Sequence, residues 1–215
     1  GDTTPLLLRG INDDILTDST SMIALGSNTS NALAPVLQVL DSSFGIDRAM
    51  FTTVHAMTNS LRLADVPTEG FRQSRAAGEN IIPGPTNSAD ILTGVMPEFA
   101  GKLTGQALNV PVADGSTVDL VAWVSTPTSA EEVNAAVRSA TQGVYAGILE
   151  YNTDPIVSSD VRMDTESGVF DSLATMVMNE TFVKTITWFN NGWGYTARVL
   201  EVARTMAASL EGVSA

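Results

Sequence analysis

Few side chains in this chain could carry covalent or metal chemistry. Its 215 residues include no cysteine and a single histidine, His55. The lack of cysteine excludes disulfide bonds, thiolate catalysis and cysteine metal sites, and one histidine gives no cluster for zinc. Hydroxyl and amide side chains remain, and they are dense between Ser27 and Asn31. The side-chain oxygens of Ser27, Asn28, Ser30 and Asn31 can cap a helix.

A helix is expected directly after these caps, from about Asn31 to Ser43. Pro35 lies in its predicted first turn, where a missing N–H costs nothing. Apolar residues at helical spacing form one stripe: Leu33, Val36, Leu37, Leu40 and Phe44. The β-branched run from Met50 to His55 then predicts a strand.

The rest of the chain predicts further strands and two more helices. Ser129 and Glu132 form a capping box for a helix that ends at Gly143, and a last helix is expected from about Tyr195 to Leu210. Residues 58–80 are weakly periodic and predict a long ordered loop. Strands are predicted at residues 107–112, 117–124, 147–151, 156–159, 174–179 and 183–189. Because strands and helices are grouped, we expect one α+β domain over residues 1–215, with helices on one face of a mixed, largely antiparallel sheet.

Composition and charge exclude several classes of protein. Hydrophobic residues are 44% and charged residues 16%, which fits a packed domain and not a disordered chain. The net charge is −13, and Lys102 and Lys184 are the only lysines, so binding to nucleic acid is not expected. No apolar run is long enough to span a bilayer, and no secretory signal opens the chain. We expect a soluble protein of the cytoplasm or of an organelle matrix or stroma.

Seven motifs, in order along the chain, resemble the catalytic domain of the glyceraldehyde-3-phosphate dehydrogenase family. Residues 27–35 (SNTSNALAP) resemble the active-site segment SCTTNCLAP, and residues 52–56 (TTVHA) resemble the strand that carries the catalytic histidine. The other matches are residues 75–77, 80–83, 97–105, 157–160 and 188–195. The resemblance covers almost the whole chain, and the fold that it implies agrees with the one expected from the residue patterns.

The resemblance implies a reaction whose nucleophile is missing here. In the family a cysteine thiolate attacks the aldehyde, a histidine acts as base, and hydride leaves to nicotinamide. The matching nucleophile position holds Asn28, whose amide is not a comparable nucleophile. The histidine is matched by His55, which without a nucleophile is a vestigial base or a histidine satisfied at the end of a strand. Ser27 and Thr29 carry hydroxyls, but they match phosphate-contact positions.

The phosphate sites implied by the resemblance are incomplete. One is matched by Thr58, but its arginine is replaced by Asn109, which removes a charged, forked donor. The other is matched by Ser27, Thr29, Thr86 and Arg75, although Asn87 replaces a glycine. A vestigial anion site at the start of the helix is therefore one hypothesis.

The resemblance also bears on cofactor and partners. The family's dinucleotide-binding half, with its G-x-G-x-x-G loop, lies N-terminal to this domain, and no such motif occurs in these residues. We therefore expect no cofactor, or NAD(P) only if a separate nucleotide-binding part is supplied. Asn191 matches the residue that contacts the nicotinamide amide.

The last helix is packed against the dinucleotide-binding half in the family. Its apolar face comprises Val199, Val202, Met206 and Leu210. We expect this face to be an exposed interface unless the helix repacks on its own domain. The family's assembly through this domain implies a homo-oligomer, with or without another protein subunit.

Three hypotheses follow for the function. The first is a catalytically inactive relative that serves as a structural, assembly or regulatory subunit. The second is a catalytic-domain fragment or subunit of an NAD(P)-dependent phosphorylating aldehyde dehydrogenase, completed by a separate nucleotide-binding part. The third is a sensor of small anions or metabolites.

Overall fold

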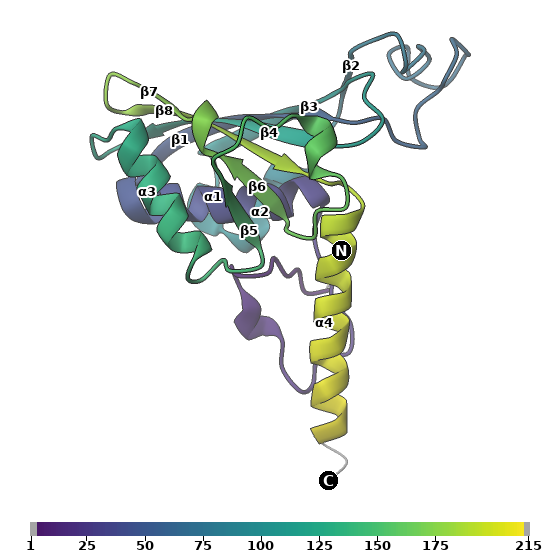
Figure 1. Cartoon of the computed structure of the whole chain (residues 1–215). Helices are drawn as coiled ribbons and strands as arrows, with labels where there is room; N and C mark the ends of the chain where they lie inside the picture. Colours follow the sequence, from purple (N-terminus) through teal and green to yellow (C-terminus); the bar gives the residue numbers. More distant parts are fainter. Residues whose placement is uncertain (1–3, 213–215) are drawn as a thin grey trace.

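One sheet organises the computed structural model, which describes residues 4–212 (Figure 1). The strands lie in the order β2-β3-β1-β4-β8-β6-β5, and β7 pairs with β8. Only the β1–β3 and β5–β6 pairs in the described chain are parallel, so the sheet is mixed and largely antiparallel. The strands are β1 (Ile46–His55), β2 (Ile82–Gly84), β3 (Leu103–Asn109), β4 (Ser116–Val124), β5 (Leu149–Asn152), β6 (Gly168–Asp171), β7 (Met176–Met178) and β8 (Phe182–Phe189).

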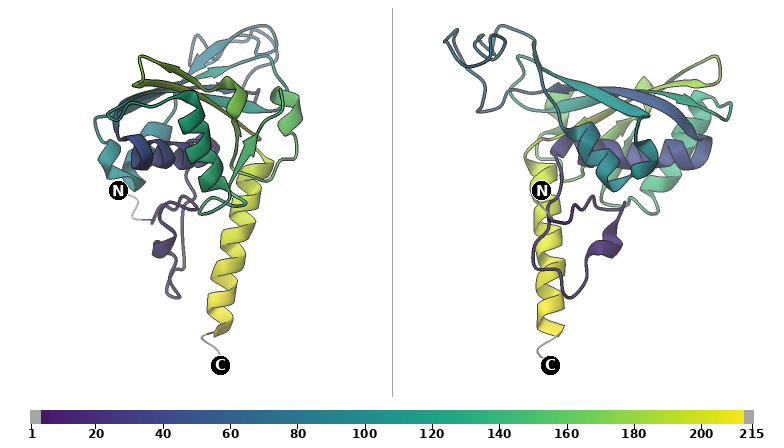
Figure 2. Two further views of the ribbon diagram at one scale, coloured as in Figure 1. Left: turned by 60° about the vertical axis from the view of Figure 1, so that its left-hand side comes forward. Right: turned by 180° about the vertical axis from the view of Figure 1, so that it is seen from behind.

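In residues 4–212 three of the four α-helices pack on one face of this sheet, as the sequence predicts, and the C-terminal one extends away from it (Figures 1 and 2). The helices are α1 (Asn28–Phe44), α2 (Ser88–Val95), α3 (Ala130–Thr141) and α4 (Trp193–Gly212). Short 3-10 turns occur at Asp13–Ile15, Pro97–Phe99, Ser158–Val161 and Ser172–Ala174. The apolar stripe of α1 and the inward side chains of the central strands form the main core, which includes Leu33, Leu37, Leu40, Phe51, Leu120 and Val183. The α+β fold class is therefore confirmed.

Capping boxes start α1 and α3. The Ser27 hydroxyl accepts from the Ser30 amide, and Ser129 with Glu132 forms the capping box expected from the sequence. Helix α1 begins three residues earlier than expected, so Pro35 lies inside it and not in the first turn. The proline removes the hydrogen bond that the Asn31 carbonyl would otherwise accept in the helix.

Several predicted elements differ from the observed ones. The strand predicted at residues 156–159 is wrong, because Ser158–Val161 is a 3-10 turn in which Asp160 accepts from the Val157 amide at 2.8 Å. Helix α2 and strands β2 and β6 were not predicted. Strand β6 is buried at all four positions, so it lacks the alternation that identifies a strand.

Helix α4 extends away from the sheet, and the N-terminal segment runs beside it (Figure 2). Leu7 and Leu25 of that segment form a small cluster with Val202, against which Met206 packs. Val202 is 2% exposed, so the exposed stripe expected on this helix is wrong at that position. Val199 is 40% exposed, and the side chain of Leu210 lies outside the described residues.

The predicted loop over residues 58–80 contains no helix and no named strand, and it extends past β2 (Figure 1). Its apolar side chains Leu63 and Phe71 are 84% and 97% exposed. In residues 4–212, no helix has the length and apolar character needed to cross a membrane.

Candidate functional site

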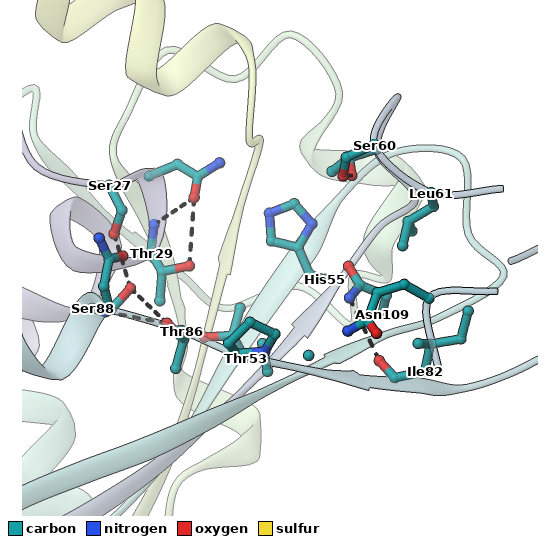
Figure 3. A pocket seen from close by; sticks show the side chains of 17 residues that line it. Ser27, Thr29, Thr53, His55, Ser60, Leu61, Ile82, Thr86, Ser88 and Asn109 are labelled. Atoms are coloured by element: carbon teal, nitrogen blue, oxygen red, sulfur yellow. Dashed lines mark hydrogen bonds between the residues drawn. The ribbon is translucent and has the colours of Figure 1, made fainter. Parts of the chain in front are cut away.

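A cavity of about 650 Å³ lies where the start of α1 meets the end of β1 and the segment before α2 (Figure 3). It brings together six residues that the sequence analysis assigned to the site: Ser27, Asn28, Thr29, His55, Thr58 and Thr86. Asn109 on β3 also lines it. Residues distant in sequence therefore meet because α1 begins and β1 ends at this corner of the domain.

Asn28 is held at both ends of its amide. Its Oδ1 accepts from the Thr29 backbone N–H at 2.8 Å, and its Nδ2 donates to the backbone oxygen of Asn191 at 3.2 Å. The amide oxygen thus occupies a donor in the first turn of α1, where a helix would otherwise offer free N–H groups to a ligand.

The hydroxyl groups near Asn28 form hydrogen bonds with one another. Ser27 Oγ lies 2.9 Å from Ser88 Oγ, which accepts from Thr86 Oγ1 at 3.1 Å. Ser27 Oγ also accepts from the Ser30 amide at 3.0 Å as the cap of α1. These hydrogen bonds link the cap of α1 to the first residue of α2 through the hydroxyls of Ser27 and Ser88. Ser88 was not expected at the site, because α2 was not predicted.

His55 stands at the end of β1 with one ring nitrogen engaged. Its Nδ1 lies 2.7 Å from the backbone oxygen of Ala56, and its ring meets Phe189 edge-on with centroids 6.0 Å apart. Because a carbonyl oxygen only accepts, this contact assigns the proton of the neutral ring to Nδ1. Nε2 is then the acceptor of the imidazole.

The expected phosphate contacts are only partly assembled. Arg75 does not line the cavity; its side chain is exposed and pairs with Asp65 at 3.2 Å. The backbone N–H of Ala76, followed by Arg75, lowers the pKa of Asp65, so this carboxylate remains charged beside the arginine. At the other subsite, Asn109 Nδ2 makes a long contact of 3.5 Å with the Ile82 carbonyl. Arg75, which we expected at the anion site, therefore lies outside the cavity.

Asn191 follows β8 but does not line the cavity. Its backbone oxygen receives the Asn28 amide, whereas its own Oδ1 is buried without a hydrogen-bond partner. Asn190 beside it accepts from the backbone N–H groups of Gly192 and Trp193 at 2.9 and 2.7 Å, in the turn that leads into α4.

A separate group of carboxylates lies outside this cavity. Oxygens of Glu150, Asp164 and Glu166 lie within 4.8 Å of one another and are close enough to hold a cation. Burial, followed by the hydrogen bond with Glu166, raises the pKa of Asp164 to about 7. A proton held by this carboxyl relieves the repulsion within the group near neutral pH.

Comparisons with known proteins agree with the motifs. Residues 27–191 match the family described as glyceraldehyde 3-phosphate dehydrogenase, C-terminal domain. The chain belongs to the glyceraldehyde 3-phosphate dehydrogenase family. It is 43% identical over 97% of its length to glyceraldehyde-3-phosphate dehydrogenase 2 of Bacillus subtilis, covering 62% of that relative. It is also 43% identical over 95% of its length to glyceraldehyde-3-phosphate dehydrogenase of Mycobacterium avium, covering 60% of that relative.

The chain thus spans about 60% of the length of the curated relatives it matches. The match to the C-terminal domain confirms the family and the domain type expected from the sequence. Within this family domain, Thr53 is a cavity residue that the sequence analysis did not single out, although it lies two positions before His55 on β1. Alternation along a strand places residues two apart on the same face, so this signal was present in the sequence.

Proposed function

We propose that this domain is a non-catalytic member of the dehydrogenase family that serves in assembly or regulation. The observation that carries the proposal is Asn28, which matches the nucleophile position and is tied to Thr29 and Asn191 by its amide. The amide nitrogen lone pair is delocalised, so Asn28 does not attack an aldehyde as a thiolate does. His55 consequently has no acid–base partner of the kind that the family uses.

The hydroxyls beside Asn28 do not supply a replacement. Ser27 Oγ is engaged as the cap of α1 and in the contact with Ser88. An alcohol becomes a nucleophile when a nearby base takes its proton, and no contact between His55 and a side-chain hydroxyl is found in the described part of the chain. Neither Ser27 nor Thr29 therefore has the nearby base that a hydroxyl nucleophile needs.

The exposed face of the sheet supports assembly with a second copy. Met50, Met176 and Met178 are 57%, 62% and 57% exposed. On the same sheet, Arg48 lies 5.3 Å from the ring centroid of Trp123, which packs on Phe182. Aromatic, methionine and arginine side chains of this kind are enriched in protein interfaces. We propose that two copies of the chain contact each other through this face of the sheet in the homo-oligomer expected from the family.

The alternative is a catalytic-domain fragment or subunit completed by a nucleotide-binding part that holds NAD(P). The observation that favours it is His55, whose Nδ1 contact leaves Nε2 as an acceptor, as a general base requires. This alternative requires that another group take the place of the missing thiolate.

An oxidation assay separates the two functions. The protein containing this chain is purified from its source and supplied with glyceraldehyde 3-phosphate, NAD⁺ and phosphate, and NADH formation is followed. The non-catalytic function predicts no rate above background, and turnover would overturn it. The purified protein is also examined by analytical ultracentrifugation, because a monomer that co-purifies with no partner would contradict the assembly role.

A further inference from the structure

We propose that the cavity binds an uncharged, polyhydroxylated small molecule of about monosaccharide size. This inference goes beyond the non-catalytic function, because it concerns what the retained cavity recognises. Its volume of about 650 Å³ lies within the range of small-molecule sites, about 300 to 1,000 Å³.

The lining of the cavity consists of hydroxyl, amide and apolar groups. Apart from His55, none of the described residues that line it has an ionisable side chain. Hydroxyl groups both donate and accept, and amides offer one group of each kind, so they match the hydroxyls of a polyol in either direction. The polar residues that line the cavity include Ser27, Asn28, Thr53, Thr58, Ser88 and Asn109.

Thr53 is the second observation that points to a ligand. Its side chain lines the cavity, the residue is 1% exposed, and its Oγ1 is buried without a hydrogen-bond partner. Figure 3 shows Thr53 beside Thr86 and below His55 at the cavity. Buried hydroxyls are nearly always hydrogen-bonded, so an unpaired one at a cavity wall is a group that a ligand hydroxyl can satisfy.

Three features disfavour an anionic ligand. The first-turn N–H groups of Thr29 and Ser30, which could hold a phosphate, are taken by Asn28 and Ser27. Arg75 is paired with Asp65 away from the cavity. The net charge of −13 adds repulsion toward any anion that approaches.

The experiment uses His55 as a single reporter, since it is the only histidine. Its ring proton resonances are followed by NMR in the full chain during titration with glycerol, ribose or glucose, and separately with glucose 6-phosphate and inorganic phosphate. The proposal expects a saturable shift with ribose or glucose and weaker binding of both phosphates. It is overturned if neither ribose nor glucose shifts His55, or if either phosphate binds more tightly than both sugars.

A matched pair of variants tests the role of the buried hydroxyl. Thr53→Val keeps the shape and removes the hydroxyl, so we expect binding of the sugar to weaken about tenfold. Thr52→Val alters the adjacent residue, which lines a hollow formed by other residues of the sheet, and should leave binding unchanged. Equal affinities in both variants would contradict the proposal. Saturation transfer to the sugar in the wild-type chain decides the question if Thr53→Val does not fold.

Failure of this proposal and failure of the proposed function give different results. Oxidation of glyceraldehyde 3-phosphate would overturn the non-catalytic function, whatever the NMR titrations show. Absence of sugar binding would overturn the ligand assignment alone.

Discussion

At the scale of single residues, Asn28 carries two parts of the proposal. It stands at the position that we matched to the family's nucleophile, and its oxygen accepts from the Thr29 N–H at the start of α1. The first part follows from the residue type and could be read from the sequence. The second depends on side-chain geometry, which places the amide between Thr29 and Asn191.

Replacing Asn28 with cysteine should create a reactive thiol at a helix start. We expect Asn28→Cys to have a thiol pKa below the usual value of about 8.5, because the N-terminus of α1 stabilises the thiolate. The rate of alkylation by iodoacetamide, measured between about pH 5 and 10, gives this pKa directly. The chain has no other cysteine, so all labelling reports position 28.

The control places the thiol at the cavity but away from the helix. Thr58→Cys lines the same cavity and should titrate closer to the usual value. If the two thiols titrate at the same pH, the start of α1 does not have the electrostatic effect inferred here.

Ser27 joins the cap of α1 to the hydroxyl network. Ser27→Ala should lower the free energy of unfolding by about 1 kcal/mol, measured by urea denaturation, because the capping box is lost. Ser129→Ala removes the equivalent cap of α3, outside the cavity, and should cost a similar amount. If Ser27→Ala leaves stability unchanged while Ser129→Ala lowers it, the cap assigned to Ser27 is wrong.

At the scale of elements, α4 depends on the N-terminal segment for its packing. Arg9 bonds Glu201 on α4 at 2.8 Å and also pairs with Asp13, while Leu7 and Leu25 pack on Val202. The half-buried ion pairs and the small apolar cluster together hold the segment to the helix. Segment and helix should therefore open together in hydrogen exchange.

Truncating the buried side of α4 should be costly. Val202→Ala removes two buried methyl groups and should destabilise the chain by about 2 kcal/mol in urea unfolding. Val199→Ala, on the 40% exposed side, should change stability by less than about 0.5 kcal/mol. Similar losses of stability in both variants would contradict the burial of Val202 and the exposure of Val199.

Elements with a strong local signal could be predicted, and those formed by tertiary contacts could not. Ser129 and Glu132 form a capping box, and residues 183–189 are rich in β-branched and aromatic side chains, so α3 and β8 could be predicted within a few residues. Strand β6 has no alternation, and α2 spans eight residues that include Gly94, so neither has a reliable local pattern.

The residues of the candidate site could likewise be predicted where a motif identifies them, but not where their position depends on tertiary contacts. Motif residues such as His55 and Thr86 were identified from the sequence, and the structure brings them to one cavity. Arg75 was assigned to the site by its motif but pairs with Asp65 instead, because the loop that carries it follows its own local contacts. The unpaired hydroxyl of Thr53 depends on packing from several elements and could not be derived from spacing.

At the scale of the whole molecule, a group of carboxylates should make stability depend on pH. The pKa of Asp164 rises from its ordinary 3.8 to about 7 in the folded chain. Between these values the folded chain keeps a proton that the unfolded chain has lost. The stabilisation from the Asp164 carboxyl is therefore complete below about pH 3.8 and is lost as the pH rises through about 7, whereas the hydrogen bond with Asp164 lowers the pKa of Glu166 and gives that carboxylate the opposite trend.

Asp164→Asn tests this dependence by removing the ionisable group. The variant should be more stable than the wild-type chain at pH 8, where the wild-type carboxyl is charged, and the difference should shrink at pH 5. Thermal unfolding across this range measures the effect. Asp14→Asn, at an exposed position outside this cluster, is the matched control for removing one carboxyl. A constant difference between Asp164→Asn and wild type at all pH values would contradict the assignment.

The whole chain combines a retained family fold with a site proposed to have lost the family's chemistry. This central claim is tested most directly by acyl transfer, which does not require a nucleotide domain. The chain is incubated with acetyl phosphate, and acyl groups are located by mass spectrometry of its peptides, with Asn28→Cys as the positive control. The proposal predicts acylation of Cys in the variant and no acyl group on the cavity residues of the wild type. An acyl group on Ser27, Thr29 or another cavity residue of the wild-type chain would contradict it.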